Sequence, residues 1–386
     1  MARKALFVTT SSADWAQVWP LAFEATRRCE VHVAIGGAHM MVDYGPTYRE
    51  VTSDLRDHRI GVHVLRNTGS GSMGHGASLL TAEVSALCTE LKPDLTFVHG
   101  DRHESVGVAL GVVLAGSRLA HIEAGVRTGT AGESLGHAIS KLAHLHFVSD
   151  DSGRDRLLQI GEHHGSVHVI GSADLDRLLR GTRPLWSEVC HRYNLRSGNK
   201  NWKRPIYVDW HASPSRTASQ NRRDTFELCE ALRALLRQGQ HVVATYPDPE
   251  THSDVVLSEL RKLDGIDSVR LLPSIDRRHW STLMREAGCV VGNSAACIAA
   301  APAVGTAAVN IGDRQCIDRA SSSVRNVPAY QREIRDEIRQ SLGRRVLPTH
   351  ERSDGKAAER FWRILGRAST WEVSAQKRLA EATVAA

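Results

Sequence analysis

The sequence predicts an α/β protein made of two similar domains, each with a parallel sheet. Short apolar segments alternate with stretches whose apolar residues recur at helical spacing, and this pattern runs once through each half of the 386-residue chain. That length is too great for one compact core and fits two domains. Strands joined through helices run parallel, and open α/β sheets bind ligands at the carboxyl ends of such strands. We therefore expect two Rossmann-like sheets that face each other across a cleft.

The first domain is expected to span residues 1–176. Its opening strand, loop and helix are of Rossmann type, but the loop lacks the GxGxxG sequence, so no dinucleotide fingerprint is present. The stretch 67–76 is rich in glycine and serine and is expected to be a loop. The predicted strands are 4–8, 30–35, 62–65, 94–99, 119–122 and 167–170. The predicted helices are 15–28, 77–91, 105–115 and 151–160.

The α/β pattern restarts in a second domain, residues 205–346. Before it, residues 177–204 mix basic and polar side chains with Pro184 and Gly198, and we interpret them as a connection. The last stretch, residues 347–386, is expected to form C-terminal helices. The strands predicted after the connection are 205–210, 241–246, 269–272, 289–291 and 307–311. The helices predicted after the connection are 223–236, 254–263, 279–286, 334–342, 356–365 and 369–382.

Composition and charge exclude several classes of function. The net charge of +6 is modest, the basic residues are scattered and aromatic residues make up 5%, which argues against a nucleic-acid partner. No apolar stretch approaches the roughly 18 residues of a membrane span, and no signal peptide is visible, so no membrane partner is expected. The seven cysteines include no CxxC pair, which favours reduced thiols and a cytoplasmic location.

Two acidic residues follow neighbouring strands of the first domain. Asp101 comes just after the strand 94–99, and Glu123 comes directly after the strand 119–122. One helix connects these strands, so both acids should leave the same edge of the sheet, where paired carboxylates suit acid/base catalysis. The alternative is that Asp101 caps the next helix and Glu123 closes a turn.

The second domain offers a phosphate site. The small residues 292–296 follow a buried strand at a helix start, where free backbone N–H groups attract anions, and Arg314 could supply a cation. Alternatively, Asn293 or Ser294 only caps the helix. His211 ends the first strand of this domain, where it could move a proton, neutralise a phosphate or act as a structural imidazole. The histidines of the first domain show no ligand pair on one helix face, so no metal site is expected.

Several motifs together resemble one enzyme family. They are Gly100-Asp101-Arg102-His103-Glu104, Ala120-His121-Ile122-Glu123-Ala124-Gly125, Arg127-Thr128-Gly129-Thr130, Glu133-Ser134, the stretch 137–148, Ile170-Gly171-Ser172, Asp174-Leu175-Asp176, Gly292-Asn293-Ser294, Ala301-Pro302 and Asn310-Ile311-Gly312-Asp313-Arg314-Gln315. In this order and spacing they resemble the hydrolysing UDP-N-acetylglucosamine 2-epimerases of sialic-acid and related amino-sugar pathways. The resemblance covers roughly residues 4–346.

The resemblance implies a GT-B architecture, two Rossmann-like domains with the active site between them and the last helices packed toward the first domain. It implies a nucleotide-sugar substrate, UDP-N-acetylglucosamine (UDP-GlcNAc), and a homodimer. Family members remove the C2 proton of the sugar and expel UDP by anti elimination through a 2-acetamidoglucal. They then add UDP back to give UDP-N-acetylmannosamine (UDP-ManNAc), or add water to give N-acetylmannosamine (ManNAc). The chemistry requires no nicotinamide or metal cofactor.

The resemblance also assigns site residues, position by position. The catalytic positions match Asp101, Glu123 and His211, with Glu133 as a further candidate. The positions that would bind the substrate or its nucleotide match Asp14, Arg127, His137, Gly292, Asn293, Ser294, Arg314 and Gln315.

Four residues depart from the family pattern. Gly132 and Gly136 stand where the family has an aspartate and an arginine. Ser12 replaces an arginine, and Ala300 replaces a glutamate. Loss of a full general acid/base costs on the order of 10²–10⁴ in rate, and Glu133 cannot simply take over, because neighbouring helical residues point about 100° apart. Two alternatives therefore stay open, a same-family enzyme with an altered nucleotide-sugar substrate and a non-catalytic ligand-binding paralogue. The paired acids disfavour a third, a GT-B glycosyltransferase.

Overall fold

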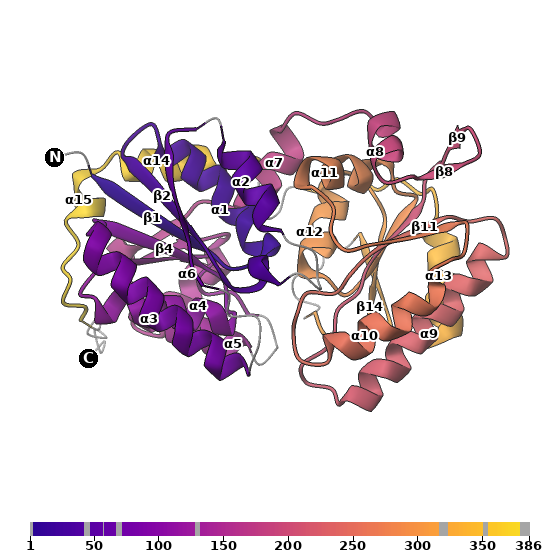
Figure 1. Ribbon diagram of the computed structural model, residues 1–386, viewed down its shortest axis with the longest axis horizontal. Helices are drawn as coiled ribbons and strands as arrows, with labels where there is room; N and C mark the ends of the chain where they lie inside the picture. The colour runs from indigo at the N-terminus through magenta and orange to yellow at the C-terminus, as the bar shows by residue number, and fades with distance from the viewer. Residues whose placement is uncertain are drawn as a thin grey trace, which may run out of the picture. The chain divides into compact units, whose positions relative to one another are not determined.

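The computed structural model describes residues 3–41, 47–56, 58–66, 72–127, 132–315, 323–349 and 354–378. The chain divides into two compact units, Met1–Asp176 with Arg352–Ala386 and Arg177–Glu351 (Figure 1). Each unit has a parallel sheet with helices, which confirms the predicted α/β class of two Rossmann-like sheets. Some sequence predictions fall outside the described residues, namely part of the loop 67–76, motif residues 128–130, Cys316 and the end of the last predicted helix.

The first unit contains a seven-stranded sheet in the order β3-β2-β1-β4-β5-β6-β7. Its strands are β1 (Lys4–Thr9), β2 (Glu30–Ile35), β3 (Ile60–Val64), β4 (Leu95–His99), β5 (Leu119–Ile122), β6 (Leu145–Val148) and β7 (Val167–Val169). Its helices are α1 (Ser12–Ala25), α2 (Tyr48–Leu55), α3 (Met73–Leu91), α4 (His103–Leu114), α5 (Gly132–Leu142), α6 (Asp151–Gln159), α14 (Ala357–Leu365) and α15 (Ala368–Trp371), with short 3₁₀ turns at Gly37–Met40 and His164–Ser166. Helix α7 (Ala173–Arg180) spans the division between the units.

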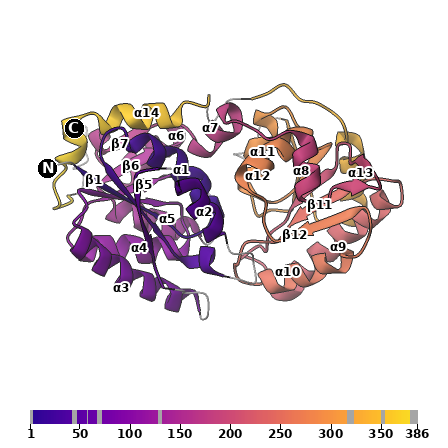
Figure 2. The ribbon, with the colours of Figure 1, turned by 45° about the horizontal axis from the view of Figure 1, so that its top comes forward.

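Helices cover both faces of this sheet, which explains why its strands are apolar on both faces. On one face, α1 and α14 cover an aromatic cluster in which Phe7 stacks on Phe97 with ring centroids 4.3 Å apart. Phe361 of α14 meets both rings edge-on. On the other face, α3, α4 and α5 cover a second cluster around Leu6 and Val98. Figure 2 shows the two layers of helices on opposite sides of the sheet.

Helix α14 is tied to the first unit through its N-terminal cap. The two carboxylate oxygens of Asp176 accept hydrogen bonds from the backbone N–H groups of Ala357 (3.0 Å) and Ala358 (2.7 Å). These N–H groups belong to the first turn, where a helix leaves its donors without intrahelical partners. Arg360 adds a bond to the carbonyl oxygen of Ile170 at 3.0 Å. The C-terminal helix therefore completes the first unit.

The predicted helix 369–382 is confirmed only over its first three residues, because α15 ends at Trp371. Residues 372–378, which we call the C-terminal strap, are not helical. Two residues that directly precede strands of the sheet bond carbonyl groups of the strap. Arg118 donates to the Val373 oxygen (2.6 Å), and His144 bonds the Ala375 oxygen (3.0 Å). Tertiary contacts therefore override the helical spacing of the sequence.

The strap ends in a buried ionic cluster around Glu162, which is 4% exposed. The Glu162 carboxylate contacts Lys377 of the strap (2.7 Å), Lys141 of α5 (2.6 Å) and His146 of β6 (2.9 Å). Burial alone would raise the pKa of Glu162, but these hydrogen bonds outweigh it and lower the pKa to about 2. Lys377 also donates to the carbonyl oxygens of Ser140 and Ala143. The cluster thus fixes the C-terminal end of α5.

We predict that Glu162→Gln removes an acid-sensitive part of the stability. Because the pKa of Glu162 falls from 4.5 to about 2 on folding, the carboxylate stabilises the fold fully above pH 4.5 and loses this effect as the pH falls toward 2. Urea unfolding should therefore find the variant less stable than wild type at neutral pH, with a difference that shrinks on acidification. Asp155→Asn, at a carboxylate that is 58% exposed, should change little. A difference between Glu162→Gln and wild type that stays constant with pH would contradict the prediction.

The second unit contains a six-stranded sheet in the order β12-β11-β10-β13-β14-β15. Its strands are β10 (Ile206–Asp209), β11 (Val242–Thr245), β12 (Val269–Leu272), β13 (Cys289–Gly292), β14 (Ala308–Ile311) and β15 (Val324–Val327). Its helices are α8 (Trp186–Arg192), α9 (Ala218–Leu236), α10 (Ser253–Leu260), α11 (Arg277–Glu286), α12 (Ala295–Ala303) and α13 (Gln331–Ser341), with a 3₁₀ turn at Arg261–Leu263.

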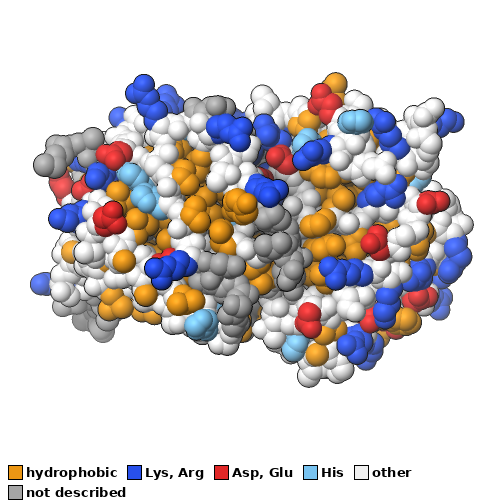
Figure 3. Space-filling model, in the orientation of Figure 1, with side chains coloured by type: hydrophobic (Ala, Val, Ile, Leu, Met, Phe, Trp, Pro, Cys, Tyr) orange, Lys and Arg blue, Asp and Glu red, His pale blue; other side chains and the backbone are white. Residues whose placement is uncertain are grey.

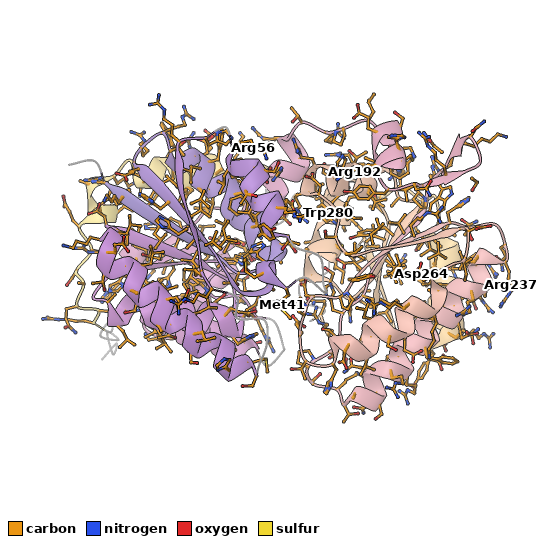
Figure 4. All side chains as sticks on the ribbon, in the orientation of Figure 1. Met41, Arg56, Arg192, Arg237, Asp264 and Trp280 are labelled. Atoms are coloured by element: carbon orange, nitrogen blue, oxygen red, sulfur yellow. The ribbon has the colours of Figure 1, made fainter. Side chains whose placement is uncertain are left out.

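Residues 177–204 are more structured than a connection, because they hold α8 and a hairpin of β8 (Arg196–Ser197) and β9 (Lys200–Asn201). Tyr193, just after α8, accepts a hydrogen bond from the backbone N–H of Asp276 at 3.0 Å, next to α11. On α11 itself, the guanidinium of Arg277 stacks over the ring of Trp280, 3.5 Å from its centroid. Trp280 is labelled in Figure 4. The segment therefore packs as part of the second unit.

Lysine and arginine side chains are distributed over the face visible in Figure 3 and do not gather in one patch. Among the described residues, no helix combines the length and the apolar character that crossing a membrane would need.

Candidate active site

The two acids lie at one edge of the first unit's sheet. β4 and β5 pair in parallel with His99 opposite Ile122, and Gly100 donates its backbone N–H to the Ile122 oxygen at 3.1 Å. Asp101 and Glu123 therefore follow the carboxyl ends of adjacent strands, as the βαβ pattern predicts. Glu123 has a φ of +60°, a conformation that is uncommon for residues other than glycine and often marks a functional site.

Glu123 is held by a network of neutral donors. Its Oε1 atom accepts hydrogen bonds from the Ser149 hydroxyl and from Nε2 of Gln17 (3.3 Å). Gln17 is itself fixed, because its Nε2 also donates to Ser172 (3.0 Å) and its Oε1 accepts the backbone N–H of Asp174 (2.9 Å). The carboxylate is thus half-buried and fixed in position, as acid/base chemistry requires.

A half-buried histidine, bonded to a buried aspartate, lies beside the two acids. His99, at the end of β4, bonds Oδ1 of Asp14 through Nδ1 at 3.0 Å. Burial alone would lower the pKa of His99, but the hydrogen bond and charge of Asp14, with the charges of Glu123 and Asp101, raise it. Burial would raise the pKa of Asp14, whereas His99, Arg102 and Thr10 lower it. Both acids therefore lie close enough to His99 to act on its charge.

Asp14 has no open face toward a ligand. It is 3% exposed, and its second oxygen accepts hydrogen bonds from the backbone N–H (3.0 Å) and hydroxyl (2.5 Å) of Thr10. Its geometry suits a residue that orients His99. The sequence offered no direct signal for this pair, because the residues are 85 positions apart and meet only through the β1–β4 pairing.

A second histidine, which is buried, supports the loop before Asp101. His121 of β5 bonds the Gly100 oxygen through Nε2 (2.8 Å) and the Ser140 hydroxyl through Nδ1 (3.0 Å). Burial lowers the pKa of His121 to about 3, so the ring is neutral at physiological pH. Nε2 therefore carries the proton that it donates to the carbonyl oxygen. His121 thus links this loop to α5.

Helix α5 brings two glycines against Asp101. A Cβ atom built on Gly132 would lie 2.7 Å from Oδ2 of Asp101, and one on Gly136 would lie 3.1 Å from the Asp101 Cβ. Glu133 is the next residue of the same helix after Gly132 and is rotated away by about 100°. Of the other residues predicted here, His137 and Arg127 are exposed.

His211 in the second unit lies in a polar pocket of its own. Its Nε2 atom contacts Oδ1 of Asp209 at 3.1 Å, and its Nδ1 atom accepts the backbone N–H of Asp248 at 3.1 Å. Burial would lower the pKa of His211, but the charge of Asp209, its hydrogen bond and the charge of Asp248 raise it. Sequence reasoning missed Asp209. The available signal was its place two residues before His211, since alternate residues of a strand share one face.

The loop after β13 is built around this histidine. Gly292 has a φ of +147°, and a Cβ atom there would lie 1.9 Å from the Asp209 oxygen, so only glycine fits. Asn293 accepts the His211 N–H (2.8 Å) with Oδ1 and donates to the His211 oxygen (2.9 Å) with Nδ2. Ser294 makes no side-chain cap on α12, and it lies close enough to Asp209 to lower the pKa of that carboxylate. Asn293 and Ser294, the two possible helix caps, therefore act on His211 and Asp209 instead.

Arg314 and Gln315 hold the other side of that loop. Arg314 donates to the oxygens of Ala212 (3.0 Å) and Asn293 (3.1 Å), and its remaining nitrogen pairs with Glu250 (3.1 Å). Gln315 donates to the same Asn293 oxygen at 3.0 Å. A cation and an amide thus lie beside the N-terminus of α12, where an anion would be favoured.

We predict that Asp209→Asn lowers the pKa of His211. The substitution removes the charge that opposes burial most strongly, and burial favours the neutral ring. An NMR titration of the histidine rings measures the shift. Asp248→Asn is the matched control and should act more weakly, because that carboxylate lies 3.9 Å from His211. An unchanged pKa in Asp209→Asn would contradict the role given to this residue.

In the part of the chain that the structure describes, no group of three or more His, Cys, Asp or Glu side chains could hold a metal ion.

Comparisons with known proteins identify the family of this chain. A family model described as UDP-N-acetylglucosamine 2-epimerase matches residues 21–366. A UDP-N-acetylglucosamine 2-epimerase of Neisseria meningitidis is 32% identical over 97% of this chain and 98% of its own. A hydrolysing UDP-N,N'-diacetylbacillosamine 2-epimerase of Legionella pneumophila is 23% identical over 95% and 96%.

Solved structures give the same fold. A Neisseria meningitidis UDP-GlcNAc 2-epimerase bound to UDP-GlcNAc has a TM-score of 0.75 at 16% identity, covering 92% of this chain and 97% of that one. A Methanocaldococcus jannaschii enzyme with UDP-GlcNAc and UDP has a TM-score of 0.76 at 15% identity, covering 94% and 99%. These structures confirm the GT-B fold class. Together with the sequence matches, they establish that the chain belongs to the UDP-N-acetylglucosamine 2-epimerase family, whose members are enzymes of the isomerase or hydrolase type.

Proposed function

We propose that the protein is a sugar-nucleotide 2-epimerase that acts on UDP-GlcNAc by anti elimination of UDP through a 2-acetamidoglucal. The observation that carries this proposal is the pair of carboxylates, Asp101 and Glu123, on adjacent parallel strands of a family member. The product is UDP-ManNAc if UDP adds back, or ManNAc and UDP if water adds. The family suggests a homodimer, and the free thiols suggest a cytoplasmic location. Both are part of the proposal.

The chemistry explains why two acids are needed. The C2 hydrogen of the sugar has no adjacent carbonyl to acidify it, so a fixed base must take it while the leaving diphosphate is stabilised. As the proton leaves C2, its electron pair forms the C1–C2 double bond, and the bond from C1 to the phosphate oxygen breaks. Asp101 and Glu123 supply the acid and base functions, and His99, bonded to Asp14, lies close to both.

The second unit supplies the groups that suit the nucleotide. The loop residues Gly292, Asn293 and Ser294 and the side chains of Arg314 and Gln315 take the diphosphate. His211, with a pKa raised by Asp209, is a cation or proton donor near neutral pH. Arg127 and His137, which are exposed in the first unit, are assigned to substrate binding. Glu133 is assigned a lesser part than the two strand-end acids, because its helix directs it away from Asp101.

Incubation with UDP-GlcNAc in deuterated water tests the reaction. We expect UDP or UDP-ManNAc to form and deuterium to enter C2 of the sugar, because the proton that returns to C2 exchanges with solvent. NMR of the product sugar separates ManNAc from UDP-ManNAc. No UDP, no epimer and no deuterium at C2 would overturn the proposal.

Variants test the assignment of the acids. Asp101→Asn and Glu123→Gln should each lower kcat on the order of 10²–10⁴-fold, the usual contribution of a general acid or base. Glu133→Gln is the comparison variant and should lose less activity than either. Wild-type rates in both strand-end variants would remove these residues from the mechanism.

A further inference from the structure

We propose that Gly132 and Gly136 are positioning residues that leave room for the Asp101 carboxylate against helix α5, and so set its direction for the reaction. This inference rests on the function proposed above for Asp101. The two glycines are four residues apart, so they share one face of the helix. A Cβ on Gly132 would lie 2.7 Å from Oδ2, 3.0 Å from Cγ and 3.2 Å from the backbone oxygen of Asp101. On Gly136 it would lie 3.1 Å from the Asp101 Cβ.

The helix itself does not need these glycines. Neither Gly132 nor Gly136 has a positive φ, so an alanine could adopt both backbone conformations. Glycine is among the poorest helix formers, so two of them in the eleven residues of α5 weaken the helix. What the glycines provide is space, and Asp101 is the residue that fills it.

The C-terminal part of the helix is held in place and resists a shift that would admit a larger side chain. Its C-terminal end is held by Lys377, which donates to the carbonyl oxygens of Ser140 and Ala143. Ser140 also bonds His121, and Ile139 is 0% exposed in the core of the unit. A Cβ at Gly132 comes nearest to the terminal atoms of the Asp101 side chain, so the carboxylate is the part that must rotate.

A side chain at position 132 should affect the activity of the protein and its stability differently. Rotation of the Asp101 carboxylate displaces it from the reacting atoms, and a misplacement of about 1 Å can cost on the order of 10²-fold in rate. The fold loses no core contact in the process. Gly132→Ala should therefore leave the protein folded but impair the chemical step.

Three glycine-to-alanine variants at helical positions test this inference. In Gly132→Ala we expect kcat to fall ten- to a hundredfold, with KM for UDP-GlcNAc and Kd for UDP within about twofold of wild type and a melting temperature at or above it. In Gly74→Ala, whose new Cβ has 4.0 Å to its nearest neighbour, activity and stability should both hold. In Gly107→Ala, whose new Cβ would lie 2.3 Å from the Ala77 backbone oxygen, stability should fall.

A double-mutant cycle identifies Asp101 as the residue affected. If Gly132 acts through Asp101, Gly132→Ala should lower kcat in the wild-type background and change nothing further in Asp101→Asn. A crystal structure of Gly132→Ala should show the carboxylate rotated about χ1. Wild-type kcat in Gly132→Ala, or an unmoved carboxylate, would overturn the inference while an inactive Asp101→Asn still supports the proposed function. An active Asp101→Asn would instead overturn the catalytic role on which the inference rests.

Discussion

The parallel pairing of β4 with β5 is the constraint on which the candidate active site depends. Because the helix α4 returns the chain to the same end of the sheet, Asp101 and Glu123 emerge together from adjacent strands. The pairing extends on both sides, since Gly100 bonds Ile122 and Glu123 bonds Phe147 through the backbone. Any shift in register would separate the carboxylates from each other and from His99. The chemistry therefore depends on the core beneath it, in particular on the stacked rings of Phe7 and Phe97.

The two units use the same electrostatic device. In each, a buried or half-buried histidine at the end of a strand bonds a buried or half-buried aspartate, which raises the pKa of the histidine while its own pKa is lowered. In the first unit the pair is His99 with Asp14, and in the second it is His211 with Asp209. Each pair places a charge at the ligand-binding edge of its sheet without exposing it fully to water, where it would be screened. A neutral histidine, His121, then fixes the loop around the first pair.

The sequence was informative where one physical signal determined the structure. Apolar runs such as Leu95–His99 and Leu119–Ile122 mark buried parallel strands, and the order of elements then determines their common edge. β15 was missed because Arg325 and Asn326 break its apolar run on the exposed edge of the sheet. The C-terminal strap was missed because its structure comes from bonds to distant residues such as Arg118. The Asp14–His99 pair was beyond prediction for the same reason, since long-range contacts leave no local pattern.

Two of the four departures from the family pattern are coupled in the structure, because both positions contact Asp101. Gly132 and Gly136 stand where an aspartate and an arginine are expected, and both lie against Asp101. A side chain at position 132 would meet the Asp101 carboxylate in its present direction, and one at position 136 would press on the Asp101 Cβ. Loss of the two side chains is then the condition for this arrangement, and the remaining acid lies in the space that they vacate. Ala300 differs, because it is 0% exposed within α12, where a glutamate would have to be buried. Under the proposed function, a ribose would then be bound without a glutamate from this position of α12.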